Sequence, residues 1–261
     1  MRLLMRYFSI LFQSQMQYKA SFYLLTFGQF FVPFSVFAGL YFLFQRFGQI
    51  RGWSFYEVAL CFAVIHMSFA ISESFARGFD AFSSLVRNGN FDRILVRPRS
   101  TVLQVLGSNF EFSRVGRLIQ SLLVLIWVVF HLSITWNVLR VVTLILMVTS
   151  GVFIFAGIFI LAATMCFWTV EAIEVANIFT DGGREMAQYP LNIYQKWVAR
   201  FFTFVIPFAS ANYLPMQYLL GKESGSQGYV YMLSSLSGIL FIVPCLGIWN
   251  LGVRHYRSTG S

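Results

Sequence analysis

The sequence predicts an all-α protein that crosses a membrane several times. Hydrophobic residues make up 57% of the 261 residues and charged residues only 11%, less than half of the roughly 25% typical of a soluble domain. The apolar residues come in long runs. A helix that rises about 1.5 Å per residue needs about 20 such residues to cross about 30 Å of hydrocarbon. Most of the chain is therefore expected to lie in lipid.

The N-terminal residues 1–20 have an amphipathic pattern. Leu4, Phe8 and Leu11 recur three or four residues apart, whereas Arg2 projects elsewhere. This spacing predicts a helix that lies in the membrane interface. A simple extension of the first crossing is the alternative.

Five apolar runs have the length of a crossing. The predicted crossings are residues 21–44, 55–75, 118–135, 141–169 and 229–251. The longest polar stretch, residues 77–101, separates the second crossing from the third and must lie in water.

The region between the fourth and last runs is ambiguous. Residues 197–220 are apolar but interrupted by Pro207 and Pro215, a pattern typical of helices broken within or at the edge of the bilayer. Hydropathy alone makes this stretch a crossing and leaves 170–199 in the cytosol. Residues 170–190 nevertheless have the length of a span, with charges at Glu171, Glu174, Asp181, Arg184 and Glu185.

The basic residues predict the orientation. Cytoplasmic termini place twelve Lys and Arg inside and six outside, in agreement with the positive-inside rule. The inside set is Arg2, Arg6, Lys19, Arg77, Arg87, Arg93, Arg97, Arg99, Arg114, Arg117, Arg254 and Arg257; the outside set is Arg46, Arg51, Arg140, Lys196, Arg200 and Lys222. The loop of residues 77–101 is then cytoplasmic. The same rule accounts for the net charge of +9 without nucleic acid.

No motif for catalysis or metal binding is present. The chain lacks the GxxxxGK[ST], HExxH and GxSxG patterns, so we expect no ATPase site of its own. Cys61, Cys166 and Cys245 lie in apolar runs without CxxC spacing, and they indicate buried thiols rather than disulfides or a zinc site. His66 and His131 are expected to be hydrogen-bonded structural residues rather than metal ligands or proton relays.

The cytoplasmic loop carries the most informative motif. Phe79, Phe82 and Val86 fall on one helical face, followed by a stop at Asn88-Gly89. This pattern predicts a short amphipathic helix that lies along the membrane surface and presents its other side to the cytosol. A connector that only contacts lipid is the alternative.

The stretch of residues 87–98, RNGNFDRILVRP, resembles the R-x-G-x-F-D-x-x-L-x-R-P stretch of type-2 ABC exporter permeases, in a branch often paired with a second permease. Three further patches are similar to the same branch in the same order. They are YPLNIY at 189–194, IPFA to NYLP within 206–215, and YRSTGS at 256–261.

The resemblance implies a six-helix half-transporter. Its cytoplasmic helix, residues 79–87, would dock into a groove on a separate ATP-binding subunit. Residues 170–190 would be the fifth crossing, and residues 191–220 a re-entrant helical hairpin on the outer side containing Pro190, Pro207 and Pro215. The implied coupling interface consists of Phe79, Phe82, Arg87, Asn88, Gly89, Phe91, Asp92 and Arg93.

The resemblance also implies partners and location. Two ATPase subunits would bind ATP and Mg²⁺, this chain would bind no cofactor, and a second permease, identical or different, would complete the transporter. The complex would lie in a bacterial inner membrane with both termini of this chain in the cytoplasm.

The expected function is export of a hydrophobic or amphiphilic cargo, such as a drug, a toxic cation or a lipid-like compound. Charged side chains in residues 170–190 would line the path. Asp181 or Glu185 would pair with Arg184. Glu171 and Glu174 would contact the cargo, or else interfacial water or arginines of a partner subunit. Two alternatives remain open. One is a proton- or ion-coupled carrier using buried carboxylates, and the other is a membrane scaffold that transports nothing.

Overall fold

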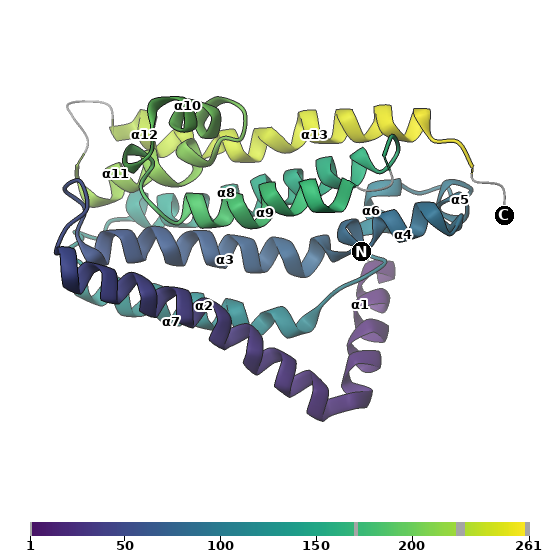
Figure 1. Cartoon of the computed structure of the whole chain (residues 1–261), viewed down its shortest axis with the longest axis horizontal. Coiled ribbons are helices and arrows are strands. Elements are labelled where there is room, and N and C mark those ends of the chain that lie inside the picture. The colour runs from purple at the N-terminus through teal and green to yellow at the C-terminus, as the bar shows by residue number, and fades with distance from the viewer. Residues whose placement is uncertain (1, 170–171, 223–227, 259–261) are drawn as a thin grey trace.

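The computed structural model is a bundle of helices arranged mostly along one long axis (Figure 1). It describes residues 2–169, 172–222 and 228–258, without the side chains of residues 2–8 and 172–176. Within these ranges the regular elements are all helices, and an isolated bridge joins Ile50 to Trp53 in a tight turn. The predicted all-α class is confirmed.

Five helical segments of the described chain are long and apolar enough to cross a membrane. They coincide with the five apolar runs: Ser9–Phe47, Phe55–Arg87, Phe112–His131, Val138–Met165 and Gly228–His255. The stretch 170–190 is not among them, so a sixth crossing remains a prediction.

The third crossing ends earlier than predicted. Helix α7 (Val115–His131) stops at His131, and Leu132 has an extended backbone, whereas the prediction continued to residue 135. Asn137 caps helix α8 (Val138–Met165) by accepting a hydrogen bond from the backbone N–H of Arg140 at 2.8 Å. A side-chain cap requires non-helical backbone before the helix, so residues 132–137 form the turn.

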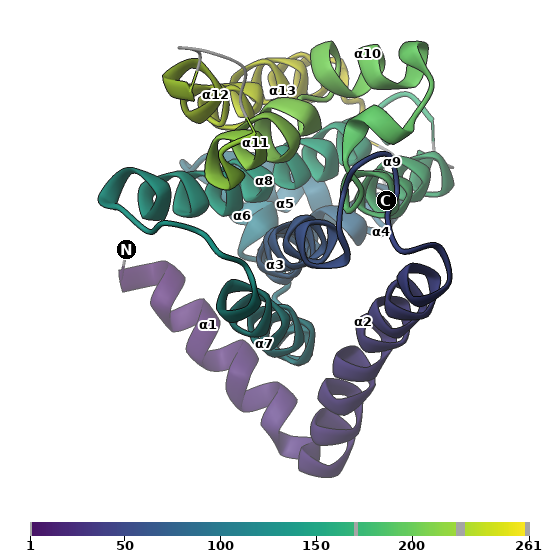
Figure 2. The ribbon, with the colours of Figure 1, turned by 90° about the vertical axis from the view of Figure 1, so that its left-hand side faces the viewer.

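Helix α3 (Phe55–Asp80) lies at the centre of the bundle (Figure 2). Every side chain from residue 58 to residue 70 is buried, and α3 packs against α7, α8, α9 (Ala172–Ala187) and α2 (Lys19–Phe47). A helix that is apolar on all sides is expected to be enclosed by other helices. The other elements are therefore arranged around α3.

Helix backbones approach each other closely at two places in the bundle, one between α7 and α2 and one between α3 and α6. Gly116 of α7 lies against the carbonyl of Thr26 in α2, and Gly78 of α3 lies against the carbonyl of Val105 in α6 (Thr101–Leu106); a methyl group on either glycine would collide with that carbonyl. Small residues serve this purpose in membrane helix packing, where the hydrophobic effect does not drive helices together.

Helix α1 (Arg2–Gln15) lies crosswise to the bundle in both views (Figures 1 and 2). A 3₁₀ turn, η1 (Met16–Tyr18), separates it from α2, so α1 does not continue the line of the first crossing. The Gln15 amide donates to the carbonyl of Phe110 and accepts from the backbone N–H of Phe112. This arrangement supports the predicted interfacial helix.

The segment between α8 and α13 is broken into short helices. α9 has 16 residues and is therefore about 24 Å long, less than the roughly 30 Å of hydrocarbon. It packs against α8 and α3. The elements that follow are η3 (Leu191–Ile193), α10 (Lys196–Phe204), the π-helical η4 (Ala209–Tyr213), α11 (Leu214–Leu220), α12 (Gly228–Ser234) and α13 (Leu236–His255).

Candidate functional site

The RNGNFDRILVRP motif of the cytoplasmic loop takes part in two short helices joined by a tight turn. α4 (Phe82–Arg87) ends at Asn88, and α5 (Asn90–Leu95) begins after Gly89. Gly89 has a φ of +66°, a left-handed conformation that glycine adopts without the strain of a Cβ atom. The predicted stop at Asn88-Gly89 is thus present. The predicted helix of residues 79–87 is shorter, because Phe79 belongs to α3 (Phe55–Asp80) and α4 begins at Phe82 after a break at Ala81. We call residues 82–100 the coupling segment; it lies at one end of the long axis, beyond α1 (Figure 1).

Three members of the predicted coupling interface are inside the molecule. Phe79 is 3% exposed, and Phe82 and Phe91 are fully buried. They form an aromatic cluster with Phe167, Trp249 and Tyr256; the ring centroids of Phe82 lie 5.0 Å from Phe91 and Trp249 and 5.2 Å from Phe167. Residues at and just after the C-terminal ends of α8 and α13 therefore cover these three rings, and their place in a coupling interface stays a prediction.

Hydrogen bonds also hold the coupling segment and the start of α6 against α13 and the residues that follow it. The Trp249 indole N–H donates to the Thr101 hydroxyl at 2.9 Å, and the Ser258 hydroxyl donates to the Asp92 carboxylate at 2.6 Å. Burial and the nearby Asp92 carboxylate raise the pKa of Tyr256 to about 12, so its phenol stays neutral. Of the predicted interface, Arg87, Asn88 and Arg93 are exposed and remain available to a partner.

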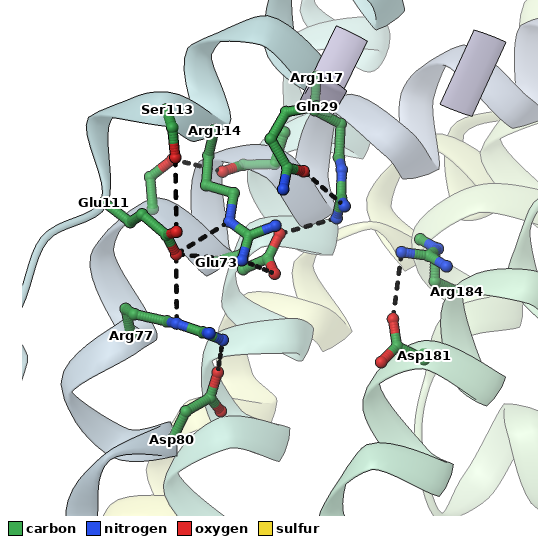
Figure 3. Close-up of polar contacts among 12 residues, drawn as sticks. Gln29, Glu73, Arg77, Asp80, Glu111, Ser113, Arg114, Arg117, Asp181 and Arg184 are labelled. Carbon is green, nitrogen blue, oxygen red and sulfur yellow. Dashed lines mark hydrogen bonds and ion pairs between the residues drawn. The ribbon is translucent and has the colours of Figure 1, made fainter. Parts of the chain in front are cut away.

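A charged network that the sequence interpretation missed joins α3 to α7. Glu73 of α3 accepts from Arg117 at 2.7 Å and pairs with Arg114 at 3.3 Å (Figure 3). Arg117 also donates to the Gln29 side chain of α2 at 3.0 Å. These charged side chains are at most 9% exposed, so each needs its partner.

The network continues toward the coupling segment. Arg114 pairs with Glu111 at 3.0 Å, Glu111 with Arg77 at 3.2 Å, and Arg77 with Asp80 at 2.6 Å. We call Glu73, Arg77, Asp80, Glu111, Arg114 and Arg117 the Glu73 network. The sequence does carry a signal for this network. Glu73 lies near the end of the second apolar run, and Arg114 and Arg117 come just before the third.

The predicted intramembrane charges form a second group on α9. Arg184 pairs with Asp181 at 3.1 Å and with Glu185 at 2.9 Å, which confirms the predicted pairing. Gln188 donates to Glu185 at 2.7 Å. We call these four residues the α9 cluster. Glu171 and the side chain of Glu174 lie outside the described part of the chain.

The α9 cluster contacts α3 through one hydrogen bond and one cation–π contact. The Gln188 amide oxygen lies 3.0 Å from Nε2 of the buried His66, so the prediction of a hydrogen-bonded histidine is confirmed. The Arg184 guanidinium lies 4.9 Å from the ring centroid of Phe69, and Arg117 lies 5.3 Å from the same ring. Arg117 of the Glu73 network and Arg184 of the α9 cluster thus contact the same ring.

The segment containing the three prolines is attached at both ends to the turn between α2 and α3. Near its start, Arg51 donates to the carbonyl of Asn192 at 2.6 Å. After its end, Lys222 pairs with Glu57 at 2.7 Å and lies 4.7 Å from the Trp53 ring. Pro190 precedes η3, Pro207 lies in the break after α10, and Pro215 lies in the first turn of α11.

A comparison with known protein families identifies the fold that carries these features. The family described as ABC-2 family transporter protein matches residues 30–260. The chain belongs to this family. It is a family of membrane subunits of ABC transporters, and membership implies association with ABC ATPase subunits. No curated protein and no solved structure matches the chain.

The ABC-2 permease has an apolar cavity of about 600 Å³ among α8, α9, α10 and α13. All of its lining residues are apolar, including Ile158, Phe179, Phe204, Phe241 and Pro244. Pockets of this size accommodate drug-sized ligands. The cavity therefore offers room for an apolar compound beside α9.

The described part of the permease was predicted to hold buried thiols and no cluster of metal-ligating side chains. No group of three His, Cys, Asp or Glu side chains there could hold a metal ion. Cys61, Cys166 and Cys245 are buried free thiols, as the sequence predicted. The Nδ1–H of His131 donates to the Trp127 carbonyl at 2.8 Å.

Proposed function

We propose that this permease is the membrane-spanning subunit of an ATP-driven exporter of hydrophobic or amphiphilic compounds. The observation that carries the proposal is the attachment of the coupling segment to the ends of the crossings. A force applied to α4 reaches α13 through the contact of Phe82 with Trp249, and Trp249 in turn contacts Phe79 of α3. Close-packed interiors transmit such displacements because they have little free volume.

The apolar cavity supports a hydrophobic cargo such as a drug or a lipid-like compound. Asp181 and Glu185 lie on the same helix as the cavity residue Phe179, and their side chains are 57% and 44% exposed. Carboxylates in such a position suit the positive charge of an amphiphilic or toxic cation. Residues 170–190 then form a sixth crossing whose charged face lines the path.

The two attachments to the α2–α3 turn support a re-entrant hairpin for residues 191–220. Asn192 and Lys222 both contact the turn between α2 and α3, Asn192 through Arg51 and Lys222 through the carbonyl of Gly52. A segment whose two ends lie beside one turn returns to the side from which it started. Under the proposed topology that side is extracytoplasmic, both termini are cytoplasmic, and the membrane is a bacterial inner membrane.

In the proposed assembly, two ATPase subunits hold ATP and Mg²⁺ and a second permease subunit, identical or different, completes the transporter.

Reconstitution with the ABC ATPase that co-purifies tests this assembly. We expect ATP-dependent export of a lipophilic dye. Gly89→Pro should abolish export, because proline cannot adopt the φ of +66°.

The matched control is Gly48→Pro. It places the same strain at a φ of +71°, in the turn between α2 and α3. We expect this variant to keep ATPase binding. Transport that survives ATP depletion but stops when the proton gradient collapses would contradict the proposal in favour of an ion-coupled carrier. Absence of both transport and ATPase stimulation would favour a scaffold.

A further inference from the structure

A cavity of about 450 Å³ lies where the corner between α1 and α2 meets the segment that leads into α7. We call it the corner cavity. Its walls are mostly polar, and two apolar side chains of α2 complete them. The polar residues are Ser14, Gln15, Tyr18, Ser21, Arg77, Asn109, Glu111 and Ser113, and the apolar residues are Phe22 and Leu25. None of these residues lines the apolar cavity beside α9, so the two cavities are separate sites.

Contacts between α1 and the residues before α7 hold the walls of the corner cavity in place. The Gln15 side chain bonds both the carbonyl of Phe110 and the backbone N–H of Phe112. The ring of Phe12 meets the ring of Phe112 edge to face, with the centroids 5.1 Å apart. These contacts fix the shape of the cavity, so a ligand can bind with little reordering of the protein.

The corner cavity lies where the polar start of the chain changes into the first crossing. Tyr18 is 75% exposed, and tyrosine is enriched at the level of the lipid headgroups. One and two turns further along the chain, Phe22 and the 55% exposed Leu25 continue the wall along α2. A phospholipid at this level would place its headgroup among the polar residues and the start of its acyl chains beside Leu25.

Two groups of opposite charge lie next to each other on the cavity wall. The Arg77 Nε lies 3.2 Å from the Glu111 carboxylate (Figure 3), and the Arg77 Nη1 donates to Asp80. The Arg77 Nη2 makes no hydrogen bond or ion pair with the described residues. On Glu111, the arginine contacts go to Oε2, whereas Oε1 accepts a long hydrogen bond from Ser113 at 3.4 Å. The wall thus offers a cationic donor beside an anionic acceptor.

The charges around the corner cavity balance. The Glu73 network contains three arginines and three carboxylates. An anionic headgroup would add uncompensated charge beside these partly buried groups, whereas a zwitterion adds none. A primary ammonium has N–H donors for a carboxylate, and a quaternary ammonium has none. The cavity therefore favours a zwitterion that carries a phosphate and a primary ammonium.

We infer that the corner cavity binds the headgroup of phosphatidylethanolamine. The phosphate accepts hydrogen bonds from Arg77, and the ammonium donates to Glu111. The hydroxyls of Ser14 and Ser21 lie on the same walls and supply further donors to the phosphate. This site goes beyond the proposed function, because it lies outside the cavity assigned to cargo. A lipid bound there joins the α1–α2 corner to the residues before α7.

The test measures lipid binding to the whole permease in detergent by native mass spectrometry. Dioleoyl phosphatidylethanolamine, phosphatidylcholine and phosphatidylglycerol are titrated separately, so that only the headgroup differs. We expect one phosphatidylethanolamine to bind about tenfold more tightly than either other lipid, the effect of one hydrogen bond to a charged group. Glu111→Gln should remove most of this preference, because the amide offers no negative charge to the ammonium.

A pair of tryptophan variants tests the position of the site. Ser14→Trp fills the cavity from an exposed position and should abolish the tight binding. Ser9→Trp is the matched control, because Ser9 is exposed on the same helix and does not line the cavity. We expect it to bind phosphatidylethanolamine as the wild type does.

Equal affinity for the three lipids, or a preference that survives Ser14→Trp, would overturn the inference. Phosphoethanolamine, which has the headgroup without the acyl chains, tests the source of the ligand. If it displaces the lipid at a comparable concentration, a soluble headgroup is the ligand and the lipid site is refuted. Failure of ATP-dependent export would contradict the proposed function and leave this binding measurement unaffected.

Discussion

The Glu73 network and the α9 cluster show two ways of placing charge inside a helical membrane bundle. In the Glu73 network the ion pairs join different helices, and Glu73 is only 9% exposed. In the α9 cluster the ion pairs stay within one helix, and Asp181 is 57% exposed. The first arrangement locks α7 to α3, whereas the second leaves α9 free of any interhelical ion pair among the described residues.

The difference suggests distinct roles for the two helices. A buried interhelical network resists relative movement, since breaking it leaves uncompensated charge. An intrahelical cluster allows its helix to shift while its pairs stay intact. We therefore expect α3 and α7 to move as one body and α9 to move against them. Unfolding free energies in detergent can test each step of this comparison.

The largest effect is expected from Glu73→Gln. It leaves Arg114 and Arg117 buried with less compensation, and loss of one partner of a buried pair costs about 3–5 kcal/mol. The free energy of unfolding measured by denaturant titration in detergent checks the value. Glu111→Gln is the matched control, because Glu111 is 29% exposed and should cost about 1 kcal/mol or less. Equal losses in the two variants would refute the buried lock.

An intermediate effect is expected from Gln188→Leu. The variant removes the hydrogen bond between α9 and His66 and leaves that buried ring with no polar partner. An unsatisfied buried polar group costs about 1–3 kcal/mol. The double variant His66→Leu with Gln188→Leu should recover part of this loss. A double variant that is as unstable as the two single losses added together would show that the contact is not a coupled pair.

The smallest effect on stability is expected from Asp181→Asn. Its side chain is mostly exposed, so the pair with Arg184 should contribute no more than about 0.5–1 kcal/mol. Export of a cationic dye should nevertheless fall, because the exposed carboxylate faces the proposed path. Export of a neutral lipophilic dye is the control. A large loss of stability would show that the α9 cluster is a structural lock like the Glu73 network. An equal loss of export for both dyes would show that the Asp181 carboxylate does not recognise the positive charge of the cargo.

Much of the architecture was readable from local patterns. Length and apolarity of the five runs predict the long helices, and Asn88-Gly89 predicts the stop between α4 and α5. The arginines beside the third run were visible as well, but their partner was not. Glu73 interrupts an apolar run, and only the antiparallel packing of α3 and α7 brings it within 2.7 Å of Arg117.

Tertiary packing also decided the roles of the aromatic residues in the coupling segment. The helical spacing of Phe79 and Phe82 shows that they share a face, and the tertiary structure alone shows that Trp249 and Phe167 cover that face. The sequence by itself thus determined the class, the apolar crossings and the position of the coupling motif, because these depend on contacts between near neighbours in the chain. Which charges pair and which rings are hidden depend on residues far apart in the chain, so only the folded bundle could decide them.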